Sequence, residues 1–62
     1  MIIYVYVPEE VPFIEDMEGK NFRICVEYYR NEKDQKLYVI DTTEEELVFL
    51  KLKYGNENVW KR

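Results

Sequence analysis

The side chains that could do chemistry near neutral pH are few in this 62-residue chain. It contains no histidine and no serine, and Cys25 is its single cysteine. Without an imidazole, the chain cannot assemble a Ser–His or Cys–His pair, and it lacks the most common metal ligand. Its two glycines, Gly19 and Gly55, do not form a phosphate-binding loop. The composition favours binding over catalysis, and we expect no catalytic residue, metal or cofactor.

Carboxylates are the remaining candidates for acid–base chemistry, and they are concentrated near the N-terminus. Residues 1–19 hold no lysine or arginine, and their acidic side chains are Glu9, Glu10, Glu15, Asp16 and Glu18. A close pair, Glu15 with Asp16 or Glu18, leaves a small dimeric enzyme with carboxylate chemistry as one alternative. Such a pair needs a desolvating pocket, which a monomer of this length does not readily form.

The same acidic segment has a second interpretation as a binding surface. The formal net charge of the chain is −4, and a concentrated negative charge steers a protein towards basic partners. We therefore predict that these five acidic residues bind a protein partner with a basic or mixed surface. The simpler alternative is a solvated loop that only keeps the protein soluble.

Aromatic side chains are the second candidate set. The rings expected on strands are Phe22, Tyr28, Tyr29 and Tyr38. Bases can stack on ring-bearing sheets, so a small nucleic-acid-binding protein that uses exposed tyrosines with Arg23 and Arg30 is another alternative. Tyr29 is the ring that we expect to be most exposed. The sequence pI of about 4.7 argues against nucleic acid as the partner, because such proteins need a positive groove.

Hydrophobic patterning predicts an α+β fold that positions these residues. We expect a small antiparallel β-sheet of three to four strands with one C-terminal helix, residues 43–54, packed on one face. The expected strands are residues 1–7, 21–30 and 36–41, with 11–15 or 58–62 as an additional strand.

Alternation along 21–30 places one set of side chains on the same face: Phe22, Ile24, Val26 and Tyr28. Cys25 then falls within an apolar strand, where we expect it to be a small buried hydrophobe.

The helix prediction rests on the chemistry of its two ends. Thr43 and Glu46 have the spacing of a capping box, and Gly55 is suited to end a helix. Lysines near the C-terminal end and glutamates near the N-terminal end also suit the helix dipole. The alternative is a strand, since residues 50–54 alternate between apolar and polar.

A second apolar stripe on this helix indicates self-association. Leu47, Leu50 and Tyr54 form one stripe, which can cover the sheet, while other apolar side chains lie across the far side. Chains of this size commonly need a staple such as a partner subunit, so we predict a homodimer. The residues expected to mediate it are Val48, Phe49, Leu52 and Trp60. The alternative is that the tail folds back over the second stripe.

Taken as a whole, the chain reads as a single domain over residues 1–62, without a membrane-spanning segment. The single cysteine is typical of a reducing compartment, so we expect a cytoplasmic protein. In size, charge and scarcity of reactive side chains it resembles very small acidic proteins of bacteriophages and mobile elements, several of which inhibit host enzymes by direct binding; no motif carries this resemblance. The resulting hypothesis is a small acidic non-enzymatic protein-binding module, an inhibitor or regulator of a larger protein.

Overall fold

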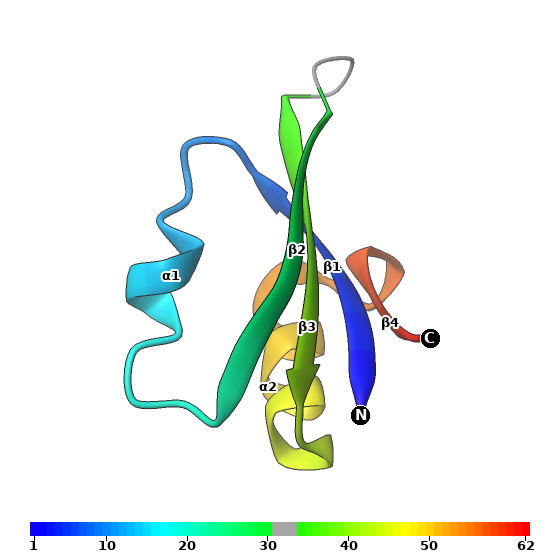
Figure 1. Ribbon diagram of the computed structural model, residues 1–62. Helices are drawn as coiled ribbons and strands as arrows, with labels where there is room; N and C mark the ends of the chain where they lie inside the picture. The colour runs from blue at the N-terminus through cyan, green and yellow to red at the C-terminus, as the bar shows by residue number, and fades with distance from the viewer. Residues whose placement is uncertain (31–33) are drawn as a thin grey trace.

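The structure is a computed structural model that describes residues 1–30 and 34–62, apart from the side chains of Tyr29 and Arg30 (Figure 1). The elements in chain order are β1 (Ile2–Pro8), α1 (Phe13–Asp16), β2 (Phe22–Arg30), β3 (Gln35–Thr42), α2 (Glu44–Tyr54), the 3-10 turn η2 (Asn56–Asn58) and β4 (Val59–Lys61). The strands form one antiparallel sheet in the order β2-β3-β1-β4. The α+β fold expected from the sequence is confirmed.

The central strand is β1, which pairs with β3 on one side and β4 on the other. Its side chains alternate strictly: Ile3, Val5 and Val7 are fully buried, and the residues between them are half-buried. This period of two is what a pleated strand requires when one of its faces contacts the core. The short strand β4 confirms that the C-terminal segment extends the sheet.

A β-bulge in β2 changes which of its side chains share a face. Ile24 pairs with Ile40 whereas Val26 pairs with Val39, so Cys25 is the extra residue. An inserted residue reverses the alternation beyond it.

The prediction that four side chains of β2 share one face is therefore wrong. Phe22 and Ile24 pack against the core, while Val26 and Tyr28 lie on the opposite face and are exposed. Cys25 is exposed rather than buried.

Helix α2 begins and ends where the cap chemistry predicts. The Thr43 side chain accepts a hydrogen bond from the Glu46 backbone N–H at 3.3 Å. Gly55 ends the helix with a φ of 97°, a conformation that a residue with a Cβ rarely adopts. The alternative strand over residues 50–54 is wrong.

The segment 11–15 is not a strand, because residues 13–16 form the single helical turn α1. The Asp16 N–H donates to the Pro12 carbonyl, and the Met17 N–H donates to the Phe13 carbonyl. Phe13 and Met17 are one turn apart and both are buried. Packing of these two side chains stabilises a helix that is too short to persist alone.

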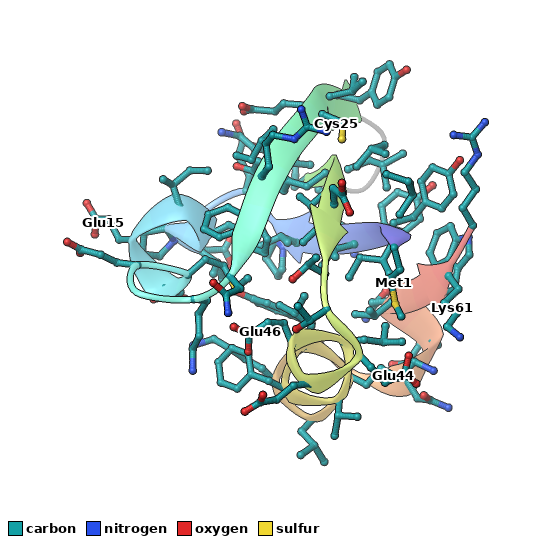
Figure 2. All side chains as sticks on the ribbon, turned by 60° about the horizontal axis from the view of Figure 1, so that its bottom comes forward. Met1, Glu15, Cys25, Glu44, Glu46 and Lys61 are labelled. Atoms are coloured by element: carbon teal, nitrogen blue, oxygen red, sulfur yellow. The ribbon has the colours of Figure 1, made fainter. Side chains whose placement is uncertain are left out.

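Both helices cover the same face of the sheet (Figure 2). The core lies between this face and the helices; it consists of Ile3, Val5, Val7, Phe13, Met17, Tyr38, Ile40, Leu47, Leu50 and Val59. No described helix covers the opposite face. None of the described helices is long and apolar enough to cross a membrane.

Candidate functional site

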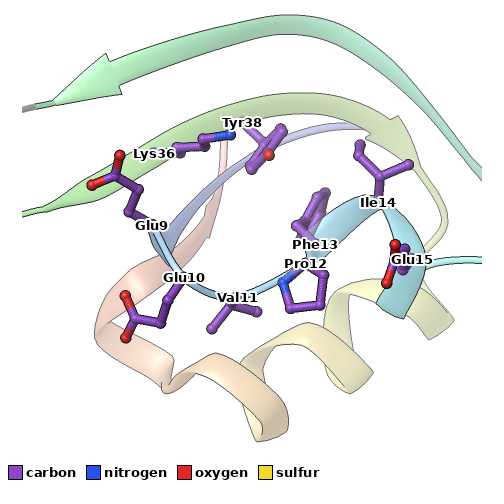
Figure 3. A pocket seen from close by; sticks show the side chains of 9 residues that line it. All are labelled: Glu9, Glu10, Val11, Pro12, Phe13, Ile14, Glu15, Lys36 and Tyr38. Carbon is purple, nitrogen blue, oxygen red and sulfur yellow. The ribbon is translucent and has the colours of Figure 1, made fainter.

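The acidic segment forms one side of an open groove with a volume of about 280 Å³ (Figure 3). The residues that line it are Glu9, Glu10, Val11, Pro12, Phe13, Ile14, Glu15, Lys36 and Tyr38. The carboxylates of Glu9 and Glu10 lie at one end, and that of Glu15 lies at the other. These three side chains are exposed. A ligand in the groove therefore meets negative charge at both ends.

Two buried rings lie beneath the middle of the groove. The rings of Phe13 and Tyr38 stack with centroids 4.3 Å apart, and both residues are almost completely buried. Lys36 also lines the groove, and its ammonium lies 3.3 Å from the Glu27 carboxylate. Because Lys36 is held in this ion pair, the charge of the groove is set mainly by its three glutamates.

The structure divides the five acidic residues expected to bind a partner. Glu9, Glu10 and Glu15 line the groove, whereas Glu18 is exposed outside it. Asp16 has a structural role: its carboxylate lies 3.3 Å from the Lys53 ammonium and accepts a hydrogen bond from the Tyr54 hydroxyl.

The Asp16 contacts change the titration of Tyr54. Burial of the phenol, reinforced by the nearby Asp16 charge and hydrogen bond, raises the pKa of Tyr54 to about 12. The neutral phenol is the form that donates to Asp16. The interaction fastens α1 to the last turn of α2.

The arrangement of the carboxylates is not that of an acid–base pair. Asp16 engages Lys53 and Tyr54 instead of Glu15, and Glu15 and Glu18 are exposed. Within the described ranges there is also no group of three or more Cys, Asp or Glu side chains able to hold a metal ion.

The uncovered side of the sheet carries a second set of rings. Trp60 of β4 packs between two tyrosines of β1, with its ring centroid 5.5 Å from Tyr4 and 5.4 Å from Tyr6. Sequence reasoning placed Trp60 among the self-association residues but missed both tyrosines. The available signal was the strict alternation of residues 2–8, which places tyrosines at two consecutive outward positions.

The residues expected to mediate self-association do not form one surface. Val48 and Leu52 are exposed on α2, at 54% and 83% respectively. Phe49 is partly buried, and the Lys20 ammonium lies 4.2 Å from its ring centroid. Trp60 packs on the outer face of the sheet. The tail therefore does not cover Val48 and Leu52, as the alternative had supposed.

Residues considered for nucleic-acid binding are only partly described. Arg23 lies 3.6 Å from the Asp41 carboxylate. Asp41 also accepts a hydrogen bond from the Met1 ammonium, and this contact, with the charge of Arg23 as a weaker contribution, lowers the pKa of Asp41. The side chains of Tyr29 and Arg30 lie outside the described residues, so the expected exposure of Tyr29 stays a prediction.

Comparison with known protein families, curated proteins and solved structures finds no match to this chain.

Proposed function

We propose that this protein is a small acidic, non-enzymatic protein-binding module that acts as an inhibitor or regulator of a larger protein. Its acidic groove is proposed to receive a lysine or arginine side chain on the surface of that protein. The observation that carries the proposal is the groove itself, which combines glutamates at both ends with apolar side chains between them. A cytoplasmic location belongs to the proposal, since the single cysteine is free.

The chemistry of lysine and arginine side chains matches this groove. Their aliphatic stems pack on apolar surface while their charged ends stay in contact with water or with carboxylates. The exposed side chains of Pro12 and Ile14 can contact the stem, and Glu9 or Glu15 can contact the charged end. Charge-assisted hydrogen bonds to carboxylates are stronger than those between neutral groups.

Net charge supports the same class of partner. A chain with a formal charge of −4 attracts basic protein surfaces at long range and repels nucleic acid. The exposed position of the groove glutamates favours binding over general acid–base catalysis, which requires a desolvated carboxyl group.

A direct test measures the binding of a fluorescently labelled arginine peptide by anisotropy, beside a peptide in which citrulline replaces every arginine. Citrulline keeps the shape of arginine and removes its charge, so only the arginine peptide should bind. The double variant Glu9→Lys with Glu15→Lys should weaken binding by about tenfold or more, since it removes charge-assisted contacts.

The matched control is the double variant Glu18→Lys with Glu57→Lys. Both control residues are exposed and neither lines the groove, so the two double variants change the net charge equally. Equal loss of binding in both would show that only net charge matters, and the groove would then have no specific role.

A further inference from the structure

The uncovered face of the sheet carries apolar and aromatic side chains that no described helix covers. Side chains of paired antiparallel residues lie on the same face, so the register identifies its members. We call this set the open sheet face: Ile2, Tyr4, Tyr6, Val26, Tyr28, Leu37, Val39 and Trp60. Three of its members are substantially exposed, with Val26 at 38%, Tyr28 at 52% and Trp60 at 39%.

We infer that the open sheet face binds a second copy of this chain, giving a face-to-face homodimer. The surface is separate from the acidic groove, which lies on the helix-covered side, and the inference does not depend on the proposed function of that groove. It also differs from the homodimer expected from the sequence, which placed the contact on Val48, Phe49 and Leu52 of α2 together with Trp60; only Trp60 is common to both.

Charge distribution is the first argument for a second copy as the occupant. A two-fold symmetric interface places each surface patch against itself, so a patch of a single sign repels its own copy. The charged side chains that the described strand residues place on the open sheet face are Arg23 and Asp41, and these two form an ion pair.

The three groove glutamates lie on the helix-covered side, whereas Glu27 and Glu44 are paired with Lys36 and Lys61. Contact between two helix-covered sides would bring the groove glutamates of both copies together, whereas contact between two open sheet faces would not. In a dimer of open sheet faces, both acidic grooves point outwards.

Area is the second argument. A stable protein interface removes about 800 Å² of accessible surface from each partner, roughly a fifth of the 4237 Å² that this protein exposes. One broad face of a molecule that measures 30 × 21 × 19 Å is of this order. The exposed stripe of α2 offers two exposed large apolar side chains, Val48 and Leu52, whereas the open sheet face offers three together with the half-buried Ile2, Tyr4, Tyr6 and Leu37 around them.

The ring cluster is the third argument. The register holds Trp60 directly opposite Tyr4, and its ring contacts both Tyr4 and Tyr6. Aromatic side chains that are already packed lose little conformational freedom on association, and tryptophan and tyrosine are the residues most enriched at the energetic centre of interfaces. Stacking of nucleic-acid bases is the competing use of such rings, but Arg23 is occupied by Asp41.

The test is sedimentation of the full chain from micromolar to millimolar concentration, combined with tryptophan fluorescence. Sedimentation should show a species of twice 7.7 kDa at the higher concentrations. Trp60 is the single tryptophan, so its emission should move to shorter wavelength over the same concentration range as a second copy covers it. A chain that sediments as a monomer throughout, or a dimer whose Trp60 emission does not change, would overturn the inference.

Two matched variants locate the interface. Tyr28→Lys should raise the dimer dissociation constant by about tenfold or more, as expected when a lysine replaces an aromatic contact at an interface. Leu52→Lys also replaces a large apolar side chain with lysine, at a more exposed site on α2. It should leave the dimer dissociation constant unchanged. Circular dichroism checks that both variants are folded. If Tyr28→Lys is unfolded, the Trp60 emission of the unmodified chain still tests whether the open sheet face is covered in the dimer.

The opposite pattern, with the dimer lost in Leu52→Lys and retained in Tyr28→Lys, would place the contact on α2 and refute the inference. A monomeric chain whose Trp60 emission is quenched by single-stranded oligothymidine would assign the open sheet face to nucleic acid instead.

Discussion

The Tyr54 hydroxyl donates a hydrogen bond to the Asp16 carboxylate across 3.4 Å and so joins α1 and α2 through two residues that are 38 positions apart in the sequence. The Lys53 ammonium lies 3.3 Å from the same carboxylate oxygen. Asp16 therefore has a different role from Glu15, its neighbour in the chain, which points into solvent at the end of the groove.

Replacement of Asp16 should destabilise the fold. Asp16→Ala removes one hydrogen bond and one ion pair, so the free energy of unfolding should fall by about 1 kcal/mol. Glu15→Ala should change it by less than about 0.5 kcal/mol, because Glu15 is exposed. Urea unfolding followed by circular dichroism measures both, and equal midpoints for the two variants would show that the Asp16 contacts contribute nothing.

The raised pKa of Tyr54 predicts a loss of stability at high pH. The unfolded phenol ionises with a pKa of 10.0, whereas the folded phenol ionises at about 12. The stabilisation is complete below pH 10.0 and is lost as the pH rises through about 12, since the unfolded state releases its proton first.

Thermal melts across this pH range should thus show a steeper decline for the unmodified chain than for Tyr54→Phe, which has no phenol to ionise. In dilute protein, Tyr28→Phe is the matched control, because Tyr28 is exposed in the single chain; it should follow the unmodified chain. If Tyr54→Phe also follows it, burial and the Asp16 contact do not raise the pKa of the folded phenol.

Local chemistry made α2 predictable from the sequence. Thr43, the three glutamates that follow it and Gly55 satisfy the helix ends without help from distant residues, and the structure places the helix there. The strands of the sheet could also be predicted from the sequence, because alternation of apolar and polar residues is a local property.

Long-range contacts and a single inserted residue account for what the sequence did not reveal. The bulge at Cys25 depends on how β2 pairs with β3, and the alternation within β2 contains no sign of it. The helical turn α1 depends on burial of Phe13 and Met17 in a core assembled from other elements. An apolar run as short as residues 11–14 does not distinguish a strand from a helix.

Long-range contacts also determine which residues form the candidate site. Sequence composition identified the acidic segment, but its division into groove residues and the structural Asp16 follows from Lys53 and Tyr54, which are distant in the chain. The stacking of the Tyr38 ring on Phe13 beneath the groove likewise requires the packing of β3 against α1.

Glu46 should be the most important glutamate for stability. It is only 8% exposed, and its carboxylate accepts a hydrogen bond from the Asn21 N–H at 2.9 Å. This contact, together with the hydrogen bond from the Thr42 hydroxyl to the Asn21 carbonyl, holds the start of β2 against α2. One half of the capping box predicted from the sequence is therefore present, namely the hydrogen bond from the Glu46 N–H to the Thr43 side chain. The Glu46 carboxylate instead accepts from Asn21.

Glu46→Ala should lower the free energy of unfolding by about 2 kcal/mol, because it leaves a partly buried N–H without its charged acceptor. Glu46→Gln keeps an acceptor oxygen and should lose less. Glu45→Ala, at an exposed position in the same helical turn, is the control. Chemical denaturation that ranks Glu45→Ala as the more damaging change would contradict this account of Glu46.

The exposed thiol of Cys25 should react with a disulfide reagent in the native state. In dilute protein, modification should be complete without denaturant, because the reagent can reach the exposed thiol in the folded state. Cys25→Ala supplies the blank. A reaction that proceeds only when the chain unfolds would mean that Cys25 is buried, as the sequence pattern alone had suggested.

The measurement that tests the proposed function most directly is an amide chemical-shift map of the protein titrated with the arginine peptide. Binding in the groove predicts the largest shifts at Glu9, Phe13, Glu15 and Tyr38, with small shifts along the glutamates at the start of α2. The citrulline peptide should produce none of these shifts. Shifts of similar size at Glu9 and at Glu45, or a map centred on α2, would contradict the proposal that the groove is the binding site.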